Sequence, residues 1–137
     1  MTQPLAVLYD GHCRLCRAGM SRLLALARPG AIEAVDFQIP GALDRFPGVT
    51  HEACMRRMHL VTPDGKVYAG FEAAIRALAT RPVMRAIVWA YYLPPVRFAF
   101  DHLYAAIAAN RYRILGRTTE CPEGTCAVHL IQSNRQR

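Results

Sequence analysis

The sequence predicts an α/β fold in which helices flank a mixed four-stranded sheet, with a helical extension at the C-terminus. Two observations predict the sheet. An apolar run, an amphipathic helical pattern and a second apolar run follow one another in residues 5–37, and a strand–helix–strand unit implies two parallel strands joined by a right-handed crossover. Later, Met58–Val61 and Lys66–Ala69 flank Thr62-Pro-Asp-Gly65, a sequence that favours a type I turn, so these two runs should form an antiparallel hairpin.

The first half of the chain supplies the parallel pair of strands. Leu5–Tyr9 is apolar without alternation, as expected for a central strand buried on both faces, and Asp10-Gly11 ends it. From Cys13 onward the apolar residues recur at helical spacing, and Pro29-Gly30 ends this helix. Ile32–Phe37 then reads as the second strand.

A connecting segment leads from the second strand to the hairpin. Residues 38–49 are rich in proline and glycine, which predicts an irregular connection with one short helical turn at Ala42–Arg45. Thr50 is a suitable N-cap for a brief helix over Ala53–Arg57. The hairpin begins immediately afterwards.

Helices dominate the rest of the chain. Residues 71–79 have helical spacing, and Pro82 and Pro95 each suit the first turn of a further helix. The order of elements is the thioredoxin topology, extended by a helical hairpin. We expect a single domain over residues 1–137, with a core at about 5–80, a helical extension at about 82–116 and a cysteine-bearing tail at 117–137.

Charge and hydropathy exclude several classes of function. The net charge is +7, but the basic residues are scattered, and neither a zinc-finger spacing nor an RNA-binding aromatic signature occurs, so we expect no nucleic-acid partner. The N-terminus lacks the features of a signal peptide. The most apolar late stretch, residues 87–100, is interrupted by Pro94-Pro95 and Arg97, so we expect no membrane span and a cytoplasmic location.

The pair Cys13-x-x-Cys16 is the main candidate for chemistry. A strand that leads into a dithiol at a helix N-terminus is typical of thioredoxin-like redox centres. Cys13 should lie near unsatisfied backbone amides at the helix N-terminus, which favour its thiolate, and should attack the substrate disulfide. Cys16 lies on the apolar side of the helix and should be the more buried, resolving thiol.

Charged neighbours are expected to tune the dithiol. Arg14, Arg17 and a protonated His12 would each stabilise a nearby thiolate. Asp10 would act in the opposite direction. Two roles are open for Asp10: it accepts the proton of the resolving thiol, or it only shapes the turn.

The other three cysteines leave alternatives open. Cys121 and Cys126 could form a second redox dithiol that relays electrons to the first, a tail disulfide, or two ligands of a zinc site completed by Cys13 and Cys16. Cys54 is expected to pack as a small apolar residue.

A set of aromatic residues lies late in the chain. Two interpretations are possible: they line a quinone or lipid site, or they pack the two late helices onto the sheet. We favour packing. The residues are Trp89, Tyr91, Tyr92, Phe98, Phe100 and Tyr104.

The segment Val7-Leu-Tyr-Asp-Gly-His-Cys-Arg-Leu-Cys16 resembles the signature of the DCC family of predicted thiol-disulfide oxidoreductases, named for its Asp and paired cysteines. The resemblance covers most of residues 5–126. It implies a thioredoxin-like fold, mostly bacterial occurrence and dithiol–disulfide exchange. Further matches are Val35-Asp-Phe37, Pro63-Asp-Gly65, Val67-Tyr-Ala-Gly70, Asn110-Arg-Tyr-Arg-Ile-Leu-Gly116 and the Cys121–Cys126 tail.

The sequence departs from thioredoxins at one point. Those proteins carry a cis-proline just before the first strand of the hairpin, where it presents the substrate backbone and discourages metal capture. Here Arg56-Arg57-Met58 precedes that strand, which weakens the case for a general protein disulfide reductase.

The leading hypothesis is therefore a thiol-disulfide oxidoreductase that uses Cys13 and Cys16, needs no organic cofactor or metal, and acts on a disulfide-bearing protein or a small thiol substrate. Two alternatives remain. One is a non-enzymatic zinc-binding or interaction module, and the other is a redox sensor whose binding surface changes when the pair is oxidised.

Overall fold

The computed structural model describes residues 3–116; the expected tail, with Cys121 and Cys126, lies outside the described residues. The strands are β1 (Leu5–Tyr9), β2 (Ile32–Asp36), β3 (His59–Val61) and β4 (Val67–Ala69). The α-helices are α1 (Arg14–Leu26), α2 (His51–Arg56), α3 (Phe71–Leu78), α4 (Arg85–Tyr91) and α5 (Pro94–Ile114). Two short 3₁₀ helices lie at Ala42–Arg45 and Pro82–Met84.

The four strands form one mixed sheet in the order β2-β1-β3-β4. Val7 in β1 lies opposite Ala34 of parallel β2 and Leu60 of antiparallel β3, and Leu60 lies opposite Tyr68 of antiparallel β4. The predicted fold class, a thioredoxin-like mixed sheet flanked by helices, is confirmed. β1 is central, and Val7 and Leu8 are completely buried on its two faces.

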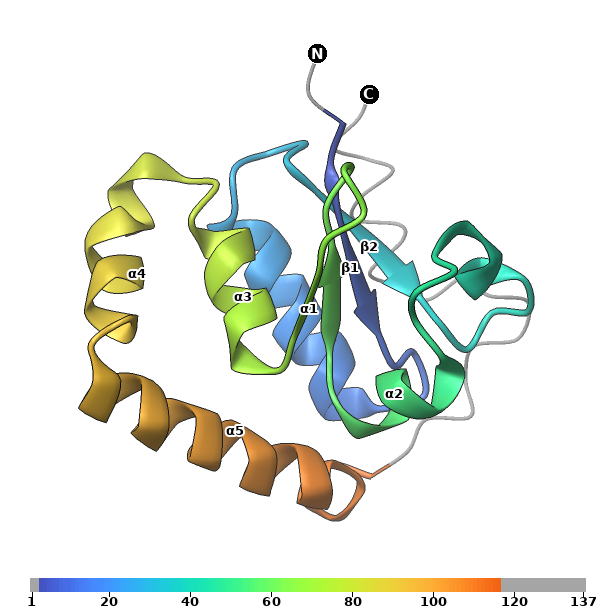
Figure 1. The fold of residues 1–137 in the computed structure, drawn as a ribbon. Helices are drawn as coiled ribbons and strands as arrows, with labels where there is room; N and C mark the ends of the chain where they lie inside the picture. The colour runs from blue at the N-terminus through green and yellow to red at the C-terminus, as the bar shows by residue number, and fades with distance from the viewer. Residues whose placement is uncertain (1–2, 117–137) are drawn as a thin grey trace.

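Helices cover the two faces of the sheet unequally (Figure 1). On one face, α1 and α3 pack against β1 through a cluster that includes Val7, Leu23 and Ala77. On the other face, residues 37–55 cover Leu8 with a second cluster. Thr50 caps α2 as predicted, because its Oγ1 accepts a hydrogen bond from the amide of Ala53 at 3.2 Å.

The helical extension leaves the α1–α3 layer and returns across the end of the sheet at which β1 leads into α1 (Figure 1). The Tyr104 hydroxyl of α5 accepts a hydrogen bond from the amide of Met58 at 2.9 Å. Phe100 stacks on Phe71 of α3 with the ring centroids 5.2 Å apart. These contacts hold α5 beside the loop that precedes β3.

The predictions for the extension are partly wrong. The helix expected to begin at Pro82 is a 3₁₀ turn followed by α4, which begins at Arg85, and α5 continues to Ile114. Tyr91 packs inside, but Trp89 and Phe98 are 70% and 66% exposed, so the aromatic set does not all pack onto the sheet. Helix packing needs only one side of each helix, and these two residues lie on the outer side. Within residues 3–116 no helix has the length and apolar character needed to cross a bilayer.

Candidate redox site

The loop between β1 and α1 is fixed by Asp36, at the end of β2. Asp36 is 2% exposed, and its Oδ1 accepts hydrogen bonds from the amides of Gly11 at 3.0 Å and Gln38 at 2.9 Å. A Cβ atom at Gly11 would lie 1.8 Å from Oδ2 of Asp36. Glycine is therefore required by close approach, and the approach holds the chain at the entrance to α1.

Cys13 is the N-cap of α1. Its backbone is extended, with φ −97° and ψ 116°, and its Sγ accepts a hydrogen bond from the amide of Cys16 at 3.2 Å. The hydrogen bond from the Cys16 thiol is the largest cause that lowers the pKa of Cys13, from 9.0 to about 7. Burial acts in the opposite direction, while the Cys16 amide and the charge of Arg111 lower the pKa further. The amide of Cys16, in the first turn of α1, thus contributes to the lowered pKa of Cys13, and stabilisation of a thiolate by the helix N-terminus stays a prediction.

The thiol of Cys16 has a raised pKa. Its hydrogen bond to Cys13 and its burial raise its pKa far above the ordinary value of a thiol, and the negative charge of Cys13 adds to this effect. The two pKa values therefore shift in opposite directions, downward for Cys13 and upward for Cys16.

The exposure of the two cysteines is the reverse of the sequence-based expectation. Cys13 is 0% exposed, whereas Cys16 is half-buried and lines a cavity between α1 and α5. The reason is the capping geometry. The sulfur of Cys13 turns back toward the amide of Cys16, while Cys16 lies on the side of α1 that faces α5.

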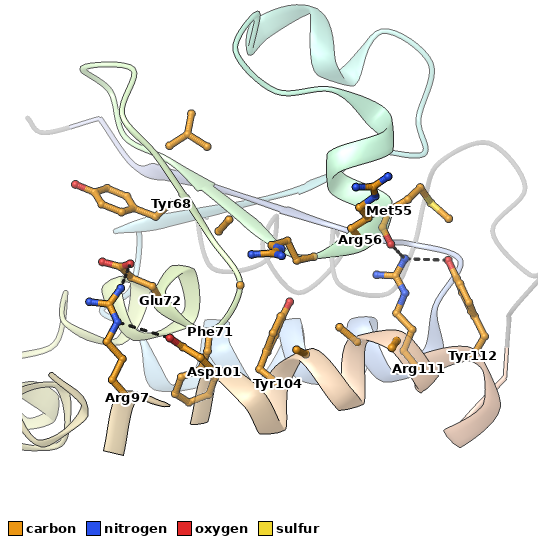
Figure 2. Close-up of a pocket in the computed structure, with 17 residues that line it drawn as sticks. Met55, Arg56, Tyr68, Phe71, Glu72, Arg97, Asp101, Tyr104, Arg111 and Tyr112 are labelled. Carbon is orange, nitrogen blue, oxygen red and sulfur yellow. Dashed lines mark hydrogen bonds and ion pairs between the residues drawn. The ribbon is translucent and has the colours of Figure 1, made fainter. Parts of the chain in front are cut away.

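Arg111 of α5 is the cation that the structure places at the dithiol. Its Nη1 lies 3.9 Å from Sγ of Cys16, and its Nη2 donates to the carbonyl oxygen of Met55 at 2.5 Å (Figure 2). The same Nη2 lies 3.3 Å from Oδ2 of Asp10, and both side chains are almost completely buried. Burial opposes the charged form of Arg111, but the surrounding groups that become negative on ionisation, Cys16, Tyr112 and Asp10, favour it, so that its pKa is raised.

Asp10 connects the dithiol loop to α5. It is 1% exposed, and its Oδ1 accepts hydrogen bonds from the amide of His12 at 2.9 Å and from Nε2 of Gln38 at 3.0 Å. Its Oδ2 accepts a hydrogen bond from the Tyr112 hydroxyl and pairs with Arg111. The bond to the His12 amide agrees with a turn-shaping role for Asp10, and its role at the resolving thiol stays a prediction. Its negative charge raises the pKa of both cysteines.

The three cations that were predicted to stabilise the thiolate are more exposed than Arg111. His12 and Arg14 are exposed, and Arg17 is half-buried. Burial and the charge of Asp36 raise the pKa of the Tyr9 phenol. The charge of Arg17 opposes this rise and is the smaller effect. The role of these three residues at the thiolate stays a prediction.

Sequence reasoning missed four residues that hold the site: Asp36, Gln38, Arg111 and Tyr112. The available signal was weak. Arg111 and Tyr112 belong to the Asn110–Gly116 segment that resembles the DCC family, but helical spacing alone places them at the end of a helix, 95 residues from Cys16.

Within residues 3–116, no three His, Cys, Asp or Glu side chains form a cluster that could hold a metal ion. The zinc alternative needs Cys121 and Cys126, outside those residues, and it stays a prediction. Cys54 packs in the core as predicted: it is 1% exposed, and burial raises its pKa to about 11.

Residues 7–117 match the model of the DCC1-like thiol-disulfide oxidoreductase family. The chain belongs to this family. The DCC1-like match includes the dithiol, the Asp36 loop and the α5 residues Arg111 and Tyr112. The name of the DCC1-like family supports a redox role and a thiol- or disulfide-bearing substrate.

A curated relative adds no function to the DCC1-like assignment. The chain is 30% identical over 129 residues to the uncharacterized protein YuxK of Bacillus subtilis (strain 168), a match that covers 84% of this chain and 83% of YuxK. No solved structure matches the chain.

Proposed function

We propose that this protein is a thiol-disulfide oxidoreductase in which Cys13 attacks and Cys16 resolves. The observation that carries the proposal is the position of Cys13 at the N-cap of α1, where its Sγ accepts a hydrogen bond from the amide of Cys16 at 3.2 Å. In this position the pKa of Cys13 is lowered to about 7, while that of Cys16 is raised. A nucleophilic thiol is most effective when its pKa is close to the ambient pH. The partner thiol must stay protonated until the mixed disulfide has formed.

The exchange proceeds in two steps. The Cys13 thiolate attacks one sulfur of the substrate disulfide and releases the other as a thiol, leaving a mixed disulfide. Cys16 then attacks the sulfur of Cys13, and the second substrate thiol leaves as the Cys13–Cys16 disulfide forms. The substrate gains two electrons and two protons, which the dithiol loses. Because Cys13 is completely buried, the substrate reaches it past the half-buried Cys16.

Asp10 and Arg111 are proposed as positioning residues. Their buried ion pair fixes the loop before Cys13, and their opposite charges act on both thiols. The oxygens of Asp10 already accept from three donors besides Arg111, which favours this role over that of proton acceptor for Cys16.

Trapping of the mixed disulfide tests the assignment of the nucleophile. The Cys16→Ser variant, treated with bis(2-hydroxyethyl) disulfide, should accumulate a one-to-one adduct on Cys13, located by peptide mass spectrometry. The Cys13→Ser variant should react much more slowly. Cys54 provides an internal control: it is as buried as Cys13, but its pKa is raised to about 11, so its thiol should stay unmodified. Fast modification of Cys16 in Cys13→Ser, with none at Cys13 in Cys16→Ser, would reverse the roles.

A redox sensor is the second candidate, favoured by the bond between α5 and the dithiol. Arg111 contacts both Cys16 and the loop carbonyl of Met55, so oxidation of the pair removes a charge that attracts α5. A sensor would show faster amide exchange in α5 after oxidation and negligible multiple turnover. An enzyme would show repeated turnover with α5 protected in both states.

A further inference from the structure

An apolar cavity lies beside the dithiol, between α1, α3 and α5. Its volume is about 360 Å³, and Cys16 and Arg111 line one end. The lining residues of α1 run from Leu15 to Leu26, which corresponds to ~16 Å of helix at the usual rise per residue. A volume of 360 Å³ lies in the range of small-molecule binding sites.

Small residues on all three helices keep this cavity open. They are Gly19 of α1, Ala74 of α3 and Ala108 of α5. A Cβ atom at Gly19 would meet nothing within 4 Å, so packing within the protein does not require glycine there. Glycine in a helix interior is destabilising relative to alanine. Its presence next to the dithiol leaves space that no side chain of the described residues fills.

The charges along the cavity leave its interior apolar. Asp10 and Arg111, at the dithiol end, neutralise each other in a buried ion pair of 3.3 Å. Arg22 also lines the cavity, but it is exposed and its guanidinium can remain in water. A charged ligand would lose hydration inside without gaining a partner, whereas an apolar ligand gains by leaving water.

The outer end of the cavity is open and apolar. Leu26 and Ile107 line it and are 43% and 40% exposed. An apolar molecule can therefore enter between α1 and α5 and pass along α1 toward Cys16. The path ends at Cys16, which is half-buried, whereas Cys13 is buried.

We propose that this cavity binds the apolar chain or ring of a small-molecule disulfide and brings its S–S bond to the dithiol. This inference rests on the proposed thiol–disulfide exchange. The reduced Cys13–Cys16 pair supplies two electrons and two protons, the S–S bond of the ligand breaks to give two thiols, and one S–S bond forms between Cys13 and Cys16. No other reactant takes part in the step.

A matched pair of disulfides tests the preference. Bis(2-hydroxyethyl) disulfide and n-hexyl 2-hydroxyethyl disulfide share one half and differ only in the apolar chain. The rate at which each oxidises the reduced protein is divided by its rate with free dithiothreitol, which removes differences in intrinsic reactivity. We expect the hexyl compound to react about tenfold faster after this correction. Equal corrected rates, or faster reaction with anionic glutathione disulfide, would overturn the proposal.

Two leucine substitutions separate the cavity from the rest of α1. Gly19→Leu adds a large side chain to the lining of the cavity, and it should abolish the preference for the hexyl compound over bis(2-hydroxyethyl) disulfide. Ala18→Leu places the same side chain at an exposed neighbouring position and should keep the preference. A preference that survives in Gly19→Leu contradicts binding in this cavity.

Binding without exchange distinguishes this inference from the proposed function. The thioether n-hexyl 2-hydroxyethyl sulfide has the same chain but no S–S bond. In ¹H–¹⁵N spectra it should shift the amide signals of Gly19, Leu23 and Ile107, and it should not do so in Gly19→Leu. Shifts in a protein that reduces neither disulfide would leave the cavity site standing and contradict the enzyme. Exchange without amide shifts and without a preference for the hexyl compound would support the enzyme and contradict the cavity site.

Discussion

Burial by itself would raise the pKa of the Cys13 thiol, because a thiolate loses hydration when it leaves water. The structure instead lowers this pKa to about 7, since the thiol of Cys16, the amide of Cys16 and the charge of Arg111 together outweigh burial and the charge of Asp10. Asp10 and Arg111 form one ion pair, yet their effects on Cys13 have opposite signs. Single substitutions can therefore separate the two.

The first prediction concerns the pH at which Cys13 becomes reactive. In the wild type, the rate of Cys13 alkylation by iodoacetamide should be half-maximal near pH 7. Arg111→Met removes the stabilising cation and should move this midpoint up by about one pH unit, whereas Asp10→Asn should move it down. Peptide mass spectrometry of protein quenched at each pH measures the rate at Cys13 alone.

Two further variants control this experiment. Arg14→Met removes an exposed cation next to Cys13 in sequence and should leave the midpoint in place. A shift as large as that of Arg111→Met would mean that Arg14, one of the cations expected from the sequence, also stabilises the thiolate. Arg111→Met also leaves Asp10 buried without its ion pair, at a cost of about 3–5 kcal/mol. The double variant Asp10→Asn/Arg111→Met removes that cost, because it leaves no unpaired buried charge. It can therefore be measured in place of Arg111→Met if the single variant does not fold.

Helix α1 shows how two glycines near one site serve different purposes. Gly11, in the loop before the helix, lies against the carboxylate of Asp36, while Gly19, inside the helix, faces open space. The first glycine is needed for the loop that positions Cys13. The second glycine, Gly19, lowers the stability of the helix and leaves the cavity beside the helix open.

The second prediction follows from this contrast. Gly11→Ala places a Cβ atom 1.8 Å from Oδ2 of Asp36, so the loop or Asp36 must move, and we expect a loss of ~1–3 kcal/mol in the free energy of unfolding. Gly19→Ala should instead stabilise by ~0.5–1 kcal/mol, because alanine is the better helix former and meets nothing. Urea unfolding of both variants measures the difference. Equal effects of the same sign would contradict the contacts at Gly11.

Helix α5 is held to the sheet through the amide of Met58. In the third prediction, Tyr104→Phe removes the hydroxyl that accepts from this amide and leaves a part-buried donor unsatisfied, which should cost ~1–3 kcal/mol of unfolding free energy. Amide exchange at Met58 should become faster. Tyr92→Phe is the matched control, because Tyr92 is 40% exposed and its substitution should change stability by less than ~0.5 kcal/mol.

For the whole molecule, local patterns were enough to predict the sheet but not the arrangement at the dithiol. Strand periodicity, turn residues and caps are short-range signals, and they predicted β1 to β4 closely. The pairing of Asp10 with Arg111 joins residues about a hundred positions apart, and no local pattern encodes it. The exposure of Cys13 depends in the same way on the geometry of the cap, which spacing does not describe.

The last prediction combines the two thiols with the stability of the whole chain. Both thiols titrate near 9.0 in the unfolded state, whereas in the folded state Cys13 titrates at about 7 and Cys16 far above the ordinary range. Between pH 7 and pH 9 the unfolded chain therefore binds more protons at this pair, so the free energy of unfolding rises with pH. Above pH 9 the folded chain still holds the proton of Cys16, and the free energy falls again.

The contribution of the dithiol should thus pass through a maximum near pH 9, after a rise of about 1–2 kcal/mol from pH 7. Urea unfolding of the reduced wild type and of Cys13→Ser/Cys16→Ser, at matched pH values, gives this contribution as a difference. Subtraction cancels the titration of Cys54 and of the buried tyrosines, which both proteins share. A difference that stays constant with pH would mean that the two thiols keep ordinary pKa values, and the proposed division into thiolate and proton donor would be wrong. A difference that falls steadily from pH 7 would mean that burial outweighs the hydrogen bonds at Cys13.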